Sequence, residues 1–179
     1  MKRQRIEVSA GAALAAALFF FFGDARLPAI VLPAVLVHEL GHCCALIHFG
    51  SRLTGLQISL FGMELNYTGE LNRKEMIICA MAGPLLGACY GIPACAFGGA
   101  NLRISGAISF SLSIFNLLPI LPLDGGRIAA AITDEVFAEK LSRAAALLLL
   151  AGGAILAAVY RAWMLLMMGI WLAFRNFRT

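Results

Sequence analysis

Residues 38–42 have the sequence His-Glu-Leu-Gly-His. On a helix, residues four positions apart lie on one face, so the rings of His38 and His42 could bind one metal ion. Glu39 is offset by about 100° around the helix axis, which suits a general base better than a ligand. This is the H-E-x-x-H arrangement of zinc hydrolases, in which the glutamate accepts a proton from water. The motif therefore predicts a hydrolytic zinc site with Glu39 as its catalytic base.

A catalytic zinc site usually takes three protein ligands, so the two histidines need a partner. One candidate is His48, which follows His38 by the spacing of H-E-x-x-H-x-x-G-x-x-H enzymes. Those enzymes need a glycine at the position of Ala45 to turn the chain back toward the metal, and here it is absent. We therefore expect His48 to lie at the membrane interface near the end of its helix.

The better candidate is Asp124, in segment 116–127 of sequence Asn-Leu-Leu-Pro-Ile-Leu-Pro-Leu-Asp-Gly-Gly-Arg. Pro119 and Pro122 interrupt the helix predicted here, and Gly125-Gly126 is expected to open it completely. Irregular backbone is tolerated near a membrane only where it is buried in protein or lines a wet cavity, so the carboxylate could turn toward an ion. The alternative is an ordinary helix end followed by a turn, with Asp124 in solvent.

Composition indicates which elements must position these residues. Of the 179 residues, 61% are hydrophobic and 13% are charged, which is far more apolar than a soluble domain. Several uncharged stretches approach the length of about 20 residues that a membrane-crossing helix needs. We expect one integral-membrane protease domain, 1–179, of the all-α class: a polytopic bundle of about six transmembrane helices at 8–22, 28–49, 76–100, 104–123, 144–160 and 162–174.

The distribution of basic residues supports six spans. With a cytoplasmic N-terminus, all of the 14 Lys and Arg residues except Arg26, Arg103 and Arg161 fall on the cytoplasmic side. Both termini are then cytoplasmic, and His42 and Asp124 both lie toward the cytoplasmic side, so a shared site is allowed. A single long tilted helix over 144–174 is the alternative to two spans, and it would weaken this charge bias.

Two further features limit the possible assignments. The basic Met1–Arg5 segment, the apolar stretch 8–22 and Gly23-Asp24-Ala25 resemble a secretory signal with a poor cleavage site, so we expect 8–22 to stay as the first helix. The five cysteines all lie in predicted spans, where packing is their usual role, and Cys43 and Cys44 are therefore not favoured as metal ligands. No basic and aromatic cluster predicts nucleic-acid binding.

Between the second and third spans, residues 54–68 alternate between apolar and polar side chains around Phe61-Gly62. This pattern predicts a short β-hairpin at the membrane surface. The hairpin could simply cover the site, or its edge strand could pair with an unwound substrate. Asn72 and Glu75 have the spacing of a cap that begins the third helix.

The pairing of His-Glu-Leu-Gly-His with the later Asn116–Gly126 segment resembles the site-2 proteases, membrane-embedded metalloproteases of peptidase family M50 that cleave transmembrane substrates. The size and span count are most similar to the branch of stage IV sporulation protein FB. The resemblance implies that His38, His42 and Asp124 bind one Zn²⁺ ion, that Glu39 is the catalytic base and that Asn116 helps to position substrate. It also implies that Ala82-Gly83-Pro84 packs beside the active site. We expect no inserted PDZ domain and no nucleotide-sensing CBS domain.

The implied activity is hydrolysis of peptide bonds in or near transmembrane segments, in a process of regulated intramembrane proteolysis. The expected partners are the lipid bilayer, a membrane-protein substrate such as a membrane-tethered transcription or sigma-factor regulator, and a membrane-bound inhibitory protein. The expected location is a bacterial cell membrane. Two alternatives remain open at this point: a metal transporter, although its usual polar path and internal repeats are absent, and a pseudo-protease that binds membrane helices without cutting them.

Overall fold

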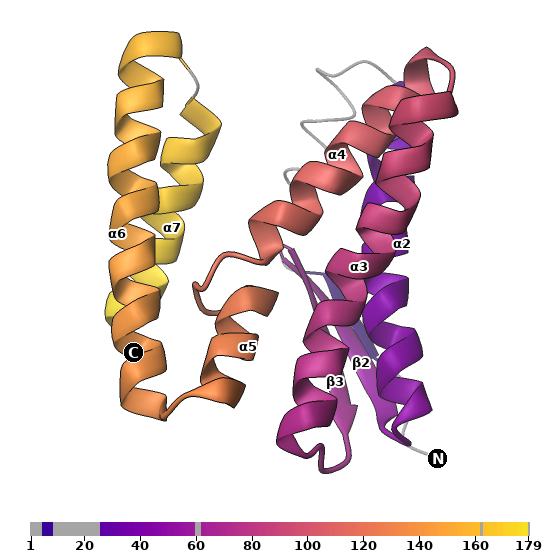
Figure 1. Cartoon of the computed structure of the whole chain (residues 1–179), viewed down its shortest axis with the longest axis vertical. Helices are drawn as coiled ribbons and strands as arrows, with labels where there is room; N and C mark the ends of the chain where they lie inside the picture. The colour runs from indigo at the N-terminus through magenta and orange to yellow at the C-terminus, as the bar shows by residue number, and fades with distance from the viewer. Residues whose placement is uncertain (1–4, 9–25, 60–61, 162, 179) are drawn as a thin grey trace. The chain divides into compact units, whose positions relative to one another are not determined.

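The computed structural model describes residues 5–8, 26–59, 62–161 and 163–178, and most of the predicted first span at 8–22 lies outside them (Figure 1). The described residues form six helices and three strands. The chain divides into two compact units, Met1–Ser113 and Ile114–Thr179. In chain order the elements are β1 (Arg5–Val8), α2 (Arg26–His48), β2 (Arg52–Ser59), β3 (Gly62–Thr68), α3 (Arg73–Phe97), α4 (Ala100–Asn116), α5 (Asp124–Ile132), α6 (Glu135–Tyr160) and α7 (Trp163–Arg178).

In the first unit, small residues bring α2, α3 and α4 into close contact. Gly41 of α2 lies against the backbone of Ala82 in α3, and Gly91 of α3 lies against the backbone of Gly106 in α4. Ser109 of α4 donates a hydrogen bond of 2.9 Å to the carbonyl oxygen of Gly87. Within a membrane, helices associate through such small residues because apolar side chains gain nothing by leaving lipid.

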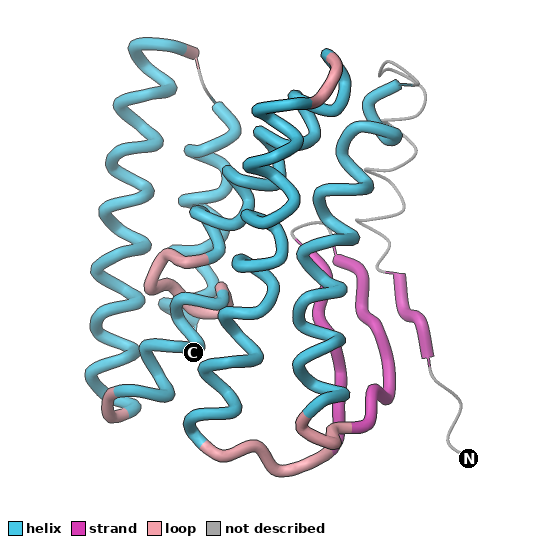
Figure 2. The backbone as a smooth tube through the Cα atoms, turned by 45° about the vertical axis from the view of Figure 1, so that its right-hand side comes forward, coloured by secondary structure: helices cyan, strands magenta, loops and turns pink. Residues whose placement is uncertain are grey.

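The three strands form one sheet in the order β1-β2-β3, drawn in magenta in Figure 2. β2 and β3 pair antiparallel, with Leu56 opposite Leu65 and a register irregularity between Leu53 and Gly55. This confirms the predicted hairpin at 54–68, which begins two residues earlier than expected. β1 was not predicted: it pairs parallel with β2, with Ile6 opposite Leu56. Because β1 occupies one side of β2, β3 is the strand at the other edge of this sheet.

The capping signal before the third helix is confirmed. The backbone N–H of Glu75 donates to Oδ1 of Asn72 at 3.0 Å, and the backbone N–H of Asn72 donates to Oε2 of Glu75 at 2.9 Å. Each side chain thus satisfies a backbone donor that the first turn leaves without a helical partner. The helix consequently begins at Arg73, three residues before the predicted start at 76.

In the second unit, α6 and α7 lie side by side as a helical hairpin (orange and yellow in Figure 1). The core of this unit contains Ile120, Ala146 and Leu172. The last predicted stretch, 144–174, is two helices rather than one, because Arg161 ends α6 with a left-handed backbone (φ 56°). α6 begins at Glu135, well before the predicted 144, and its N-cap Asp134 accepts a hydrogen bond of 2.8 Å from Phe137 N–H.

Among the described residues, α2, α3 and α6 are long and apolar enough to cross a membrane, judged by length and composition. The predicted fourth span at 104–123 differs from the structure, where α4 covers Ala100–Asn116 and a short irregular segment follows. The helix ends there because Pro119 and Pro122 cannot donate backbone hydrogen bonds. Many large apolar side chains of α2 are exposed, including Leu32 and Leu36, as expected for surfaces that face lipid.

Candidate metal site and catalytic residues

The structure brings His38 and His42 together on one face of α2. Their Nε2 atoms lie 3.2 Å apart, and the two ring centroids are separated by 4.9 Å. His38 is buried and His42 is half-buried. Two nitrogens bound to one zinc ion at 2.0–2.1 Å in tetrahedral geometry would lie about 3.3 Å apart, so this spacing suits a shared ion.

The other ring nitrogen of His42 is fixed by a neighbouring helix. Nδ1 of His42 lies 2.8 Å from the carbonyl oxygen of Cys79 in α3. A carbonyl can only accept, so the proton of a neutral imidazole must sit on Nδ1, and Nε2 keeps its lone pair. A hydrogen bond from the far nitrogen to a carbonyl also orients a metal-binding histidine. The chemistry of His42 therefore fits a metal ligand.

Two glycines of α3 lie beside the histidine rings. A Cβ atom on Gly83 would collide with the ring of His42, whose Cδ2 atom would lie only 2.6 Å away. A Cβ atom on Gly87 would lie 3.7 Å from Nδ1 of His38 and would collide with Oγ of Ser113. The expected packing of Ala82-Gly83-Pro84 beside the motif is thus present at Gly83. Gly83 thus forms a cradle for the His42 ring, whereas Gly87 makes an ordinary contact with the His38 ring and packs closely on Ser113.

Glu39 follows His38 on α2 and is half-buried. His48 is the last residue of α2 and is exposed, with its ring 5.1 Å from that of Phe49. His48 is thus exposed at the end of the helix, as expected, while its position at a membrane interface stays a prediction.

Asp124 belongs to the second unit, where it is the first residue of α5 and is buried, with 7% of its surface exposed. The alternative of a solvated aspartate in an open turn is therefore wrong. The expectation that Gly125-Gly126 opens the chain is also wrong, because both glycines lie inside α5. They are needed for close packing: a Cβ on Gly125 would collide with the backbone of Leu117, and one on Gly126 would collide with the backbone of Ile120.

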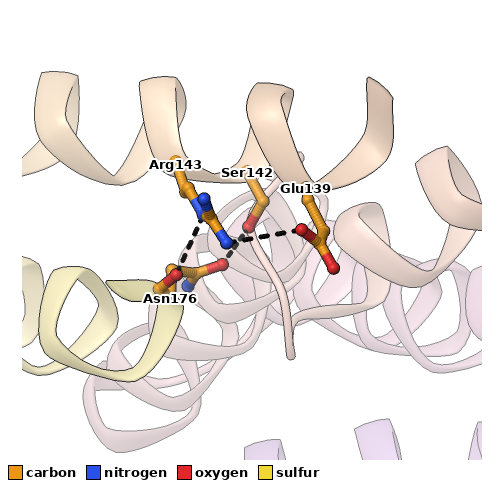
Figure 3. Close-up of polar contacts among 4 residues, drawn as sticks. All are labelled: Glu139, Ser142, Arg143 and Asn176. Atoms are coloured by element: carbon orange, nitrogen blue, oxygen red, sulfur yellow. Dashed lines mark hydrogen bonds and ion pairs between the residues drawn. The ribbon is translucent and has the colours of Figure 1, made fainter. Parts of the chain in front are cut away.

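Two polar side chains, Ser142 and Asn176, hold the segment that leads into Asp124; Figure 3 shows these two side chains together. The backbone N–H of Leu121 donates to Oγ of Ser142 in α6 at 2.7 Å, and Nδ2 of Asn176 in α7 donates to the carbonyl oxygen of Leu121 at 2.7 Å. Ser142 Oγ also donates to Oδ1 of Asn176. Both backbone polar groups of Leu121 are thereby satisfied by side chains.

Asn116, expected to position substrate, is the last residue of α4 and is half-buried. The predicted span at 104–123 placed Asn116 inside a helix, whereas the structure places it where α4 gives way to irregular backbone. Sequence reasoning did not select Ser142, Asn176 or the carbonyl group of Cys79. A signal existed for Asn176, since an amide in an apolar helix is costly unless it is hydrogen-bonded. The backbone carbonyl of Cys79 gives no sequence signal at all.

Fold and motif together define a polytopic helical protein with a hydrolase-type histidine pair in an apolar helix. Residues 99–160 match the model of Peptidase family M50. The candidate zinc metalloprotease Rip3 of Mycobacterium tuberculosis is 32% identical over 167 residues, which are 81% of this chain and 42% of Rip3. Stage IV sporulation protein FB of Bacillus subtilis is 32% identical over 123 residues, which are 63% of this chain and 42% of that protein.

A candidate zinc metalloprotease of Synechocystis is 29% identical over 117 residues, 60% of this chain and 31% of the relative. The chain thus spans less than half the length of these relatives. The site-2 protease of Methanocaldococcus jannaschii has the same fold: it is superimposed with a TM-score of 0.68 at 21% identity over 97% of this chain and 89% of that one. The M50 match and the two relatives at 32% identity support assignment of the chain to the site-2 protease family, peptidase family M50, and this family together with the apolar helices supports an integral membrane protein.

Proposed function

We propose that this chain is an intramembrane zinc metalloendopeptidase that hydrolyses peptide bonds in or near transmembrane segments of membrane-bound substrates. The observation that carries the proposal is the His38–His42 arrangement, with Nε2 atoms 3.2 Å apart and Nδ1 of His42 held by the Cys79 carbonyl. In the proposal Asp124 is the third ligand of one zinc ion per chain. The buried position of Asp124 at the start of α5 supports this role, because a buried carboxylate needs a cation or strong donors.

When bound, zinc supplies Lewis-acid chemistry that activates water near neutral pH and polarises a carbonyl group. Glu39 accepts the proton that the attacking water loses and returns it to the leaving amine nitrogen when the peptide bond breaks. His38 and His42 would each offer Nε2 to the ion, and the hydrogen bond from Nδ1 of His42 to the Cys79 carbonyl selects the tautomer that leaves Nε2 of His42 available. The hydroxyl group of one water thus becomes part of the new carboxyl end, and its proton goes to the new amino end.

Substrate must reach the site in an extended form, because the hydrogen bonds of a helix shield its peptide bonds. β3 is an edge strand of the sheet, and an edge strand offers unpaired backbone groups to which an extended segment can add. We propose that the unwound substrate pairs with β3 and that Asn116 hydrogen-bonds its backbone near the scissile bond.

The proposed setting is a bacterial cell membrane with both termini cytoplasmic and the active site toward the cytoplasmic side, as the distribution of basic residues favours. The proposed substrates include membrane-tethered transcription or sigma-factor regulators, and a membrane-bound inhibitor would control access. Water would enter through a polar path from the cytoplasmic face.

The test combines a metal measurement with a cleavage measurement on the full chain in detergent. We expect about one zinc per chain in the wild type, clear loss in Asp124→Asn, and retained zinc without cleavage in Glu39→Gln. Full cleavage by Glu39→Gln would overturn the proposed base. Zinc that moves across vesicles in the Glu39→Gln variant would instead support a transporter, and substrate that is bound but left intact by the wild type would support a pseudo-protease.

A further inference from the structure

A second polar site lies within the second unit, at the end of the α6–α7 hairpin that holds the last turn of α7. It is a pocket of about 310 Å³. Arg127 of α5, Arg143 of α6 and Arg175 of α7 line it together with Glu139 and Asn176, and Leu121 and Pro122 complete its wall. Three guanidinium groups against one carboxylate give the pocket a net positive charge, which favours an anionic ligand.

One of the three arginines, Arg143, is held by three contacts, two of which are drawn in Figure 3. Nε of Arg143 donates to the backbone carbonyl oxygen of Asn176 at 3.1 Å, and its terminal nitrogen lies 3.3 Å from Oε2 of Glu139. Its guanidinium carbon lies 6.0 Å from the centre of the Phe177 ring. The pocket wall is also fixed, since Asn176 holds the Leu121 carbonyl. A site with pre-positioned donors loses little conformational entropy when a ligand binds.

The surroundings of the pocket have the character of a membrane–water interface. In the last turns of α7, the guanidinium carbon of Arg175 lies 5.7 Å from the centre of the Trp171 ring, and that of Arg178 lies 4.6 Å from the Phe174 ring. Phe174 and Phe177 are each 57% exposed. Aromatic rings beside basic side chains are typical of helix ends at the level of lipid headgroups. The basic residues here also belong to the set that the charge distribution places on the cytoplasmic side.

We propose that this pocket binds the phosphate-bearing headgroup of an anionic phospholipid in the cytoplasmic leaflet. Guanidinium groups pair with phosphate oxygens through two parallel hydrogen bonds, and basic pockets among helices on the cytoplasmic side suit anionic headgroups. The acyl chains of such a lipid would lie along the exposed apolar surface of α7. None of the residues that line this pocket is a proposed zinc ligand, and the binding does not depend on proteolysis.

The experiment counts bound lipid by native mass spectrometry while the full chain in detergent is titrated with phosphatidylglycerol or with phosphatidylcholine of the same acyl chains. The pocket variant is Arg127→Gln with Arg175→Gln, two exposed positions at which the helices should still form. The matched control is Arg73→Gln with Lys74→Gln, which removes two charges from the first turn of α3. We expect the pocket variant to bind phosphatidylglycerol about tenfold more weakly or worse, and the control to bind like the wild type.

The variant Arg127→Lys with Arg175→Lys keeps the charge and should retain most of the affinity, which separates lost binding from lost folding. Equal weakening in the pocket variant and the control would reduce the effect to general surface charge and overturn the proposal. Equal binding of the two lipids would also overturn it. If inorganic phosphate displaces phosphatidylglycerol at matched concentration, the ligand is a free anion and the lipid assignment is wrong.

Discussion

The side-chain amide of Asn176 donates a hydrogen bond of 2.7 Å to the carbonyl oxygen of Leu121, 55 positions earlier in the chain. The same amide nitrogen also lies 2.9 Å from the carbonyl oxygen of Leu172, one turn earlier in α7. Together with Ser142, this residue ties the irregular segment before Asp124 to both helices of the α6–α7 hairpin. The geometry of the proposed third metal ligand thus depends on a buried amide near the end of the chain.

Asn176→Leu is therefore expected to loosen the segment around Leu121. The substitution leaves the Leu121 carbonyl without its donor in a buried setting, which costs about 1–3 kcal/mol. Hydrogen exchange should show the change directly. The backbone N–H of Leu121, which donates to Oγ of Ser142, should lose protection from exchange. Asn101→Ala, at an exposed position of α4, serves as the control and should leave exchange in this segment unchanged. Unchanged protection of Leu121 in Asn176→Leu would show that the amide does not hold the segment.

Gly83→Ala is expected to disturb the motif without replacing a metal ligand or the base. The added methyl group would occupy space that the His42 ring now fills, so the ring must move from the Cys79 carbonyl. We expect weaker zinc binding, by about 10–100-fold as is usual when a partner that orients a ligand is lost. Zinc affinity measured against a competing chelator checks this.

Gly152→Ala is the matched control for Gly83→Ala. Gly152 lies inside α6, and a Cβ atom there would meet nothing within 4 Å. Because alanine favours a helix over glycine by about 0.5–1 kcal/mol, this variant should keep zinc and be no less stable than the wild type. Equal zinc affinity in both alanine variants would show that the Gly83 cradle is unimportant for the metal.

Local signals in the sequence predicted the structure best. The Asn72–Glu75 cap, the hairpin and the break at Arg161 each depend on a few neighbouring residues, and each is present. Helix limits were less accurate where hydropathy alone set them. α6 begins at Glu135 because the Asp134 cap and backbone hydrogen bonds continue through charged residues that a membrane-span argument leaves out.

Long-range contacts explain what the sequence could not predict. β1 forms by pairing with β2, with Ile6 opposite Leu56, and the residues Arg5–Val8 alone do not predict that pairing. Gly125-Gly126 predicted an open chain, yet both glycines lie in α5. Glycine is needed at these positions because the backbone of Leu117 and Ile120 leaves no room for a Cβ. The motif gave His38 and His42 correctly as a pair, but the Cys79 carbonyl that orients His42 lies 37 positions away.

The cap of α3 gives a simpler test of stability. Asn72→Ala removes the acceptor for Glu75 N–H at the start of the helix that carries Gly83 and Gly87. Loss of such a cap costs about 1 kcal/mol, while the backbone N–H of residue 72 keeps its hydrogen bond to the Glu75 carboxylate. Unfolding of the full chain in mild detergent should show the decrease. Asn72→Asp keeps an acceptor and should recover most of the stability, whereas equal losses in the two variants would argue against a capping role.

Zinc should stabilise the fold through His42 and not through His48. A ligand that binds only the folded chain at about 100 times its dissociation constant adds about 2.7 kcal/mol. We expect added zinc to raise the Tm of the metal-stripped wild type and to have little effect on His42→Gln. His48→Gln also removes an imidazole, but from the exposed end of the same helix. Added zinc should therefore raise the Tm of this variant as it does for the wild type. A zinc response that vanished in His48→Gln but persisted in His42→Gln would reverse the assignment and make the terminal histidine the ligand.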